Sequence, residues 1–249
     1  MANIKGFFTK VRNLKKEDIK EHFKKRKERR QMILEKRRNG KFAKKMQPVY
    51  KWMNRFSLVL HYLLACVLNF LIEVISRHSF FEAWGYMTGT PLVFLFNAFL
   101  IFATFMIVYL FRRRVLVRLI MSCFWLLLGI INGVILANRV TPFTGPDLRN
   151  LSDGAKVVTK YLSKGTMILV AAALVALLAF FVWVWIKGPK FQGKIRWYLN
   201  VPLIALVIVL FTGATNLALA KRVLSSYFVN IAFAYQDYGY PYCLAVTLF

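Results

Sequence analysis

The chain has 249 residues, of which 58% are hydrophobic and 23 are phenylalanine, and its formal net charge is +26. That apolar share is more than the core of a soluble domain of this size requires, so the composition indicates a protein built for lipid. The charge is uneven, because the chain through Arg55 carries 20 basic and five acidic residues, a net charge of +15. A basic tail beside an apolar body is typical of a cytoplasmic segment at a membrane, and no nucleic acid is expected as a partner.

The first segment, residues 1–55, is predicted to be a basic cytoplasmic tail. Residues 13–38 have the composition of a highly charged helix whose apolar positions are too sparse to bury a face. Asn39 and Gly40 end this pattern, and aromatic and basic residues then lead up to position 56. Such rings and charges anchor a helix at the membrane interface.

Five apolar runs follow the tail. About twenty apolar residues cross the hydrocarbon core of a bilayer, and the runs that meet this length are 56–75, 91–111, 115–137, 167–186 and 201–220. The predicted fold is therefore an all-α membrane protein, a five-transmembrane-helix bundle over residues 56–220. Residues 221–249 are interpreted as an extracytoplasmic connector.

The orientation of the bundle is predicted from the basic residues in its short turns. Arg112, Arg113, Arg114 and Arg118 lie around one turn, and four more basic residues follow the fourth run. Short loops rich in Lys and Arg stay in the cytoplasm. The N-terminus should then be cytoplasmic and the C-terminus extracytoplasmic, although the longer loop after the third run, which is also basic, runs against this rule.

That longer loop is predicted to hold a short external amphipathic helix. Thr144 or Gly145 would cap it, with Pro146 at the first helical position and Asp147 in the first turn. Apolar residues then recur at helical spacing as far as Leu162. The candidate residues for contact with lipid headgroups are Arg139, Thr141, Thr144, Arg149, Lys156 and Lys160. For the lysines, a solvated face is the competing interpretation.

The first apolar run has a polar face made of Asn69, Glu73 and Arg77, which lie four residues apart. Glu73 and Arg77 are close enough to pair locally. The face either lines a groove for a lipid headgroup or fixes the packing of the bundle, and the second interpretation is favoured. No catalytic residues, metal ligands or cofactor-binding motif are identified in this chain.

Two segments resemble the lipoteichoic acid synthase-like proteins. The segment Asn138-Arg-Val-Thr-Pro-Phe-Thr-Gly-Pro-Asp-Leu148, just outside the third run, is similar to an Arg-Val-Thr-Pro-Leu-Thr type segment of that family. The segment Asn230-Ile-Ala-Phe-Ala-Tyr-Gln-Asp-Tyr-Gly-Tyr-Pro-Tyr242 resembles the stretch that follows the fifth helix and leads towards an extracellular sulfatase-like domain. With the basic tail and the helix count, the resemblance spans nearly the whole chain.

The resemblance implies a function in lipoteichoic acid biosynthesis at the cell wall. Family members belong to the sulfatase and alkaline phosphatase superfamily, and their catalytic domain transfers glycerol phosphate from phosphatidylglycerol with a threonine nucleophile and manganese. That domain is absent from these 249 residues, so whether the chain is an enzyme is left open. The expected role is the membrane anchor of a phosphoglycerol transferase in the bacterial cell membrane, with phosphatidylglycerol, other anionic lipids and the sulfatase-like domain as partners.

Two other classes of function compete with this interpretation. The first is a stand-alone multi-pass lipid transporter or flippase, which often shows internal repeats or helices broken at the midplane. The spans here are mostly uninterrupted and show no repeat, which counts against transport. The second is a membrane scaffold protein whose basic tail binds anionic lipid or a cytoplasmic partner.

Overall fold

The computed structural model describes residues 55–150, 164–187 and 197–248, together with Glu21, Lys25, Arg26, Glu28, Arg29 and Met32 of the tail. The chain divides into two compact units, Met1–Ser57 and Leu58–Phe249. The tail residues named above are all helical, and Lys25 forms an exposed ion pair with Glu21. The rest of the predicted basic helix lies outside the described residues.

Within the described residues, four helical stretches are long and apolar enough to cross a membrane, which is the pattern of a multi-pass membrane protein. They are α3 (Ser57–Arg77), α5 (Pro91–Phe105) continued by the 3-10 helix η1 (Met106–Leu110), α6 (Arg114–Leu136) and α10 (Trp197–Ala220). These helices match the first, second, third and fifth predicted runs. The described part of the chain is all helical, without strands, and the all-α fold class is confirmed there.

The fourth predicted run lies within α9 (Lys164–Lys187). Within the described residues, the apolar part of α9 is Val175–Ile186, which is shorter than a full span. The count of five transmembrane helices therefore stays a prediction. α9 contacts α6, and the Arg113 guanidinium lies 4.4 Å from the centre of the Trp185 ring.

Close packing of α3 against α6 depends on two glycines spaced four residues apart. A Cβ added at Gly129 would lie 3.1 Å from the Ile72 side chain, and one added at Gly133 would lie 2.8 Å from the Ile75 carbonyl oxygen. Small residues at this spacing let two helix backbones approach in a membrane, where packing rather than hydrophobicity holds helices together. The two helices thus lie in direct contact over the second half of each.

The short helix α4 (Phe80–Gly89) lies between the first two spans and was not among the predicted elements. Ser79 caps it by accepting a hydrogen bond from the Glu82 backbone N–H at 3.3 Å. The sequence Ser-Phe-Phe-Glu at 79–82 carries the Ser-x-x-Glu pattern of a helix start, so a local signal for this helix was present. At its other end, Thr90 ends α4 and Pro91 begins α5.

The segment after α10 folds into α11 (Ile231–Tyr238) and α12 (Tyr240–Leu248) and packs into the bundle. Tyr240, Cys243 and Leu244 are buried in the same apolar cluster as Ile72 and Phe105. α12 also contacts α5 and the short helix α7 (Gly145–Arg149). This segment is therefore part of the folded core, and its predicted role as a connector stays a prediction.

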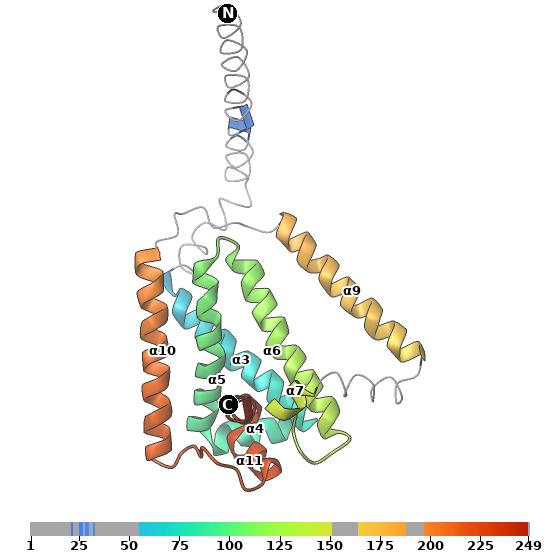
Figure 1. Cartoon of the computed structure of the whole chain (residues 1–249), viewed down its shortest axis with the longest axis vertical. Helices are drawn as coiled ribbons and strands as arrows, with labels where there is room; N and C mark the ends of the chain where they lie inside the picture. The colour runs from blue at the N-terminus through green and yellow to red at the C-terminus, as the bar shows by residue number, and fades with distance from the viewer. Residues whose placement is uncertain are drawn as a thin grey trace, which may run out of the picture. The chain divides into compact units, whose positions relative to one another are not determined.

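Figure 1 shows α4, α7, α11 and the C-terminus gathered at one end of the helices, which we call the α4 end. It is the end at which α3 and α6 finish and α5 begins. Away from it, large apolar side chains on α6 and α10 are exposed, for example Ile120, Phe124 and Val209. Such surfaces suit contact with lipid acyl chains. Most of the buried polar and charged side chains lie instead towards the α4 end, among them Glu73, Ser76, Asn97 and Asn132.

Candidate functional site

An ion pair within α3 lies at the centre of the α4 end. Glu73 is fully buried, and its Oε2 accepts a hydrogen bond from Nε of Arg77 at 2.9 Å. The other carboxylate oxygen, Oε1, accepts from the backbone N–H of Tyr240 at 2.8 Å. A buried carboxylate requires such partners, because an unpaired buried charge is strongly destabilising. The predicted local pairing of Glu73 with Arg77 is confirmed.

Arg77 also ties α3 to α11. Its Nη2 donates to the Gln236 carbonyl oxygen at 3.0 Å. The guanidinium carbon lies 4.5 Å from the centre of the Tyr86 ring and 5.1 Å from that of Tyr235. Planar guanidinium groups stack favourably on aromatic faces. Arg77 is therefore engaged by protein groups on several sides, and the arrangement holds a chain segment in place.

A second tie holds the turn between α11 and α12. Nδ2 of Asn97 donates to the Tyr238 carbonyl oxygen at 2.7 Å, and the Tyr86 hydroxyl donates to the same oxygen at 3.2 Å. Burial raises the pKa of Tyr86 well above its ordinary value, so its hydroxyl keeps the proton it donates. Gly239 follows with φ of +74°, and a Cβ added there would lie 2.4 Å from the Tyr86 hydroxyl oxygen. Both the conformation and the space require glycine at this turn.

The third residue of the predicted polar face, Asn69, points to a different neighbour. Its Nδ2 donates to the Phe94 carbonyl oxygen at 3.1 Å, which joins α3 to α5. Glu73 and Arg77 on α3 thus hydrogen-bond to α12 and α11, whereas Asn69 on the same helix hydrogen-bonds to α5. All three make contacts that fix packing, which is the interpretation that the sequence favoured. Whether any of them also contacts a lipid stays a prediction.

In the loop after α6, Arg139 organises the candidate headgroup residues. Its guanidinium pairs with both carboxylate oxygens of Asp147 and donates to the carbonyl oxygens of Thr141 and Pro142 at 3.0 and 2.9 Å. Burial by itself would raise the pKa of Asp147, but hydrogen bonds from Arg139 and Thr144 outweigh it and hold the pKa below its usual value. Arg139, one of the predicted headgroup contacts, is therefore paired within its own loop.

The remaining candidates connect this loop to the end of the chain. Thr144 caps α7 and donates from its N–H and its hydroxyl to Oδ2 of Asp147, at 2.9 and 2.8 Å. Arg149 donates to the Leu248 carbonyl oxygen at 3.0 Å. The N–H of Gly145 donates to the Thr247 hydroxyl at 2.9 Å. Thr141 contributes its carbonyl to Arg139, while Lys156, Lys160 and most of the predicted amphipathic helix lie outside the described residues.

Asn132 on α6 completes the network beneath the loop. It donates to the Ser76 hydroxyl at 3.0 Å and accepts from the Phe143 N–H at 2.7 Å. These two bonds join α6 to α3 and to the loop that follows it. The sequence had not singled out Tyr86, Tyr240 or Gly239, because their partners lie far away in the sequence.

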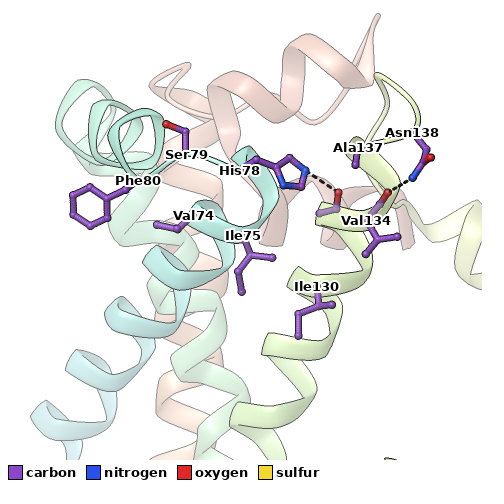
Figure 2. Close-up of a pocket in the computed structure, with 10 residues that line it drawn as sticks. Val74, Ile75, His78, Ser79, Phe80, Ile130, Val134, Ala137 and Asn138 are labelled. Atoms are coloured by element: carbon purple, nitrogen blue, oxygen red, sulfur yellow. Dashed lines mark hydrogen bonds between the residues drawn. The ribbon is translucent and has the colours of Figure 1, made fainter. Parts of the chain in front are cut away.

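A groove runs along the contact between the ends of α3 and α6. Its volume is about 510 Å³. Figure 2 shows its walls, with Ile75 from α3 and Ile130 and Val134 from α6, and its polar rim of His78, Ser79 and Asn138. His78 has φ of +54° and its Nε2 lies 3.0 Å from the Gly133 carbonyl oxygen. Within the described ranges, no three His, Cys, Asp or Glu side chains lie close enough to share a metal ion.

No family model, curated protein or solved structure matches the chain.

Proposed function

We propose that this chain is the membrane module of a lipoteichoic acid synthase-like phosphoglycerol transferase. In this role it anchors an extracellular sulfatase-like domain to a bacterial cell membrane and holds it close to phosphatidylglycerol and other anionic lipids of the outer leaflet. The manganese and the threonine nucleophile would belong to that domain.

One observation carries the proposal. The two segments that resemble the family, 138–148 and 230–242, are about ninety residues apart in the sequence, yet Phe143 of the first is buried in the same apolar cluster as Tyr235 and Tyr240 of the second. α7 contacts α12, and Gly145 and Arg149 hydrogen-bond to Thr247 and Leu248. A segment that leads to a catalytic domain has to be fixed relative to the membrane if that domain is to reach lipid at a constant height. Docking of this kind supports an anchoring role.

The proposed orientation places the α4 end outside the cell and the Arg112–Arg114 turn in the cytoplasm. The basic turn and the basic tail support this assignment through the preference of Lys and Arg for cytoplasmic loops. The same arrangement favours an anchor over a transporter. Glu73, Arg77 and Asn97 hold the C-terminal segment, and a transport path would use such polar groups along a passage.

The proposal is tested by reading the coding frame past codon 249 and expressing the whole frame in a bacterium depleted of its own polyglycerolphosphate synthase. The expected result is a sulfatase-like domain with a threonine nucleophile and metal ligands, and polyglycerolphosphate on immunoblots. The informative variant is Gly239→Val, which removes the docking of α11 and α12. Its matched control is Gly213→Val in α10, where an added Cβ meets nothing within 4 Å.

We expect the Gly239 variant to reach the membrane and make less polymer than the Gly213 control. Equal polymer from both variants would contradict the anchoring role of the docked segment. A frame without a sulfatase-like domain, combined with no polymer, would overturn the proposed function.

A further inference from the structure

The groove in Figure 2 is lined mainly by apolar side chains from α3 and α6. Its walls belong to α3 and α6, two of the helices that are apolar and long enough to span a membrane. Its volume of about 510 Å³ is within the range of about 300–1,000 Å³ that is usual for small-molecule sites. Ile130 and Val134 are 48% and 59% exposed. In a bilayer these side chains would face acyl chains, so an apolar chain is the natural occupant of the groove.

The rim of the groove is polar. His78, Ser79 and Asn138 are its polar residues, and among the described residues no Lys, Arg, Asp or Glu lines it. The two arginines next to the rim in the sequence are both paired, Arg77 with Glu73 and Arg139 with Asp147. The described rim therefore offers a phosphate no unpaired arginine, which favours a neutral head.

The hydrogen bonds at the rim indicate which head fits. The Nε2–H tautomer of His78 donates to the Gly133 carbonyl oxygen and has Nδ1 as an acceptor. Nδ2 of Asn138 donates to the Val134 carbonyl oxygen at 2.7 Å, and the amide has a second N–H that can donate to a ligand. The Ser79 oxygen accepts from Glu82, and its own proton can be donated. One acceptor at His78 and donors at Asn138 and Ser79 match a lipid hydroxyl beside an ester carbonyl.

We propose that the groove binds a diacylglycerol-type lipid, with one acyl chain along α3 and α6. Its glycerol hydroxyl donates to Nδ1 of His78 and accepts from the second N–H of the Asn138 amide, and an ester carbonyl accepts from Ser79. The inference rests on the membrane placement in the proposed function and not on its enzymatic part.

The test uses the purified chain in phosphatidylcholine nanodiscs that contain a diacylglycerol with a photoreactive diazirine in one acyl chain. After irradiation and digestion, mass spectrometry quantifies the label on peptides covering 74–80 and 130–138. Val134→Trp fills the groove from an exposed position. The matched control is Leu127→Trp on the same helix, where Leu127 is 46% exposed and does not line the groove. Ala137→Phe is a second groove-filling variant, for use if Val134→Trp does not give a monodisperse protein.

We expect labelling of both peptides in the wild type and in Leu127→Trp, and a reduction of about tenfold in Val134→Trp, which corresponds to about 1.4 kcal/mol of binding free energy. A probe whose hydroxyl is methylated should label several-fold less, and phosphatidylglycerol should compete less well than unlabelled diacylglycerol. Equal labelling of Val134→Trp and Leu127→Trp would overturn the site. Equal labelling by the methylated probe, or equal competition by phosphatidylglycerol, would overturn the assigned occupant.

The same variants separate this inference from the proposed function. If the wild-type chain is not labelled while the full reading frame makes normal polymer, the inferred lipid site is wrong and the proposed function stands. If labelling is normal and no polymer is made, the transferase role is wrong and the lipid site stands.

Discussion

The carboxylate of Glu73 on the first span accepts a hydrogen bond at 2.8 Å from the backbone N–H of Tyr240, which lies 167 residues later in the chain. The same carboxylate pairs with Arg77, and Arg77 donates to the Gln236 carbonyl oxygen. A single buried ion pair therefore holds the beginning of the bundle to its last two helices. Its removal should loosen the C-terminal segment before it affects the spans.

The first prediction is that Glu73→Gln destabilises the protein by about 3–5 kcal/mol, because it leaves the Arg77 charge partly buried without its carboxylate. Thermal unfolding in detergent measures the loss, and limited proteolysis should show earlier cleavage within residues 221–248. The matched control is Glu21→Gln, which breaks the exposed Glu21–Lys25 pair of the same spacing. An exposed pair of this kind contributes little to stability, because solvent screens it. Equal effects of the two substitutions would contradict the role given to Glu73.

The second prediction concerns the turn between α11 and α12. Gly239→Ala should destabilise the protein by at least about 1–3 kcal/mol, because alanine is strained at positive φ and its Cβ would collide with the Tyr86 hydroxyl. Gly213→Ala lies inside α10 in open space and should stabilise the helix by up to about 1 kcal/mol. Melting temperatures of both variants test this pair. A neutral Gly239→Ala would show that the turn is not constrained as described.

The third prediction is a pH dependence of the loop after α6. The pKa of Asp147 is lower in the folded protein than its unfolded value of about 3.9. A depressed carboxyl pKa contributes stability that is present above the unfolded value and is lost as the pH falls through the folded one. Protease cleavage of the loop should therefore increase as the pH is lowered from 5 to about 2.5, measured with an acid-active protease. Asp147→Asn should raise cleavage at pH 5 and remove most of the pH dependence.

The fourth prediction tests the opposite end of the bundle. His61 lies buried on α3, with Nδ1 at 3.0 Å from the Tyr109 hydroxyl and Nε2 accepting from Nε of Arg118 at 2.9 Å. Tyr109→Phe removes one of these contacts and should lower the free energy of unfolding by about 1 kcal/mol. Tyr198→Phe, at an exposed position on α10, is the control and should change it by less than about 0.5 kcal/mol. A larger effect at Tyr198 would contradict this account.

Local signals were enough to predict several features of this fold. Apolar runs of sufficient length predicted α3, the α5–η1 stretch, α6 and α10, because the bilayer thickness fixes how long a span must be. The helix start at Thr144 or Gly145, where the structure has Thr144 as the cap, and the pairing of Glu73 with Arg77 were also predicted, since both depend on residues three or four positions apart. α4 carried a comparable local signal at Ser79 and Glu82, and it was missed because its apolar stretch is too short to be a span.

The connections between distant segments depended on the tertiary structure. Residues 221–249 were predicted to be an extracytoplasmic connector, and the structure buries α12 in the bundle and fits Gly239 against Tyr86 and Asn97. The Arg139 side chain looked available for lipid phosphate and is instead paired with Asp147. The groove at His78 exists because Gly133 lets α6 approach Ile75 closely.

The sequence by itself determined that the chain is an all-helical protein with several apolar helices long enough to cross a membrane. Those features follow from composition and from spacing along one helix, where neighbours are set by the helical repeat. The tertiary structure alone decided which polar groups are occupied, where the C-terminal segment docks and where a groove stays open. Those features depend on contacts between residues up to 167 positions apart, and the spacing of residues within a single helix carries no information about such contacts.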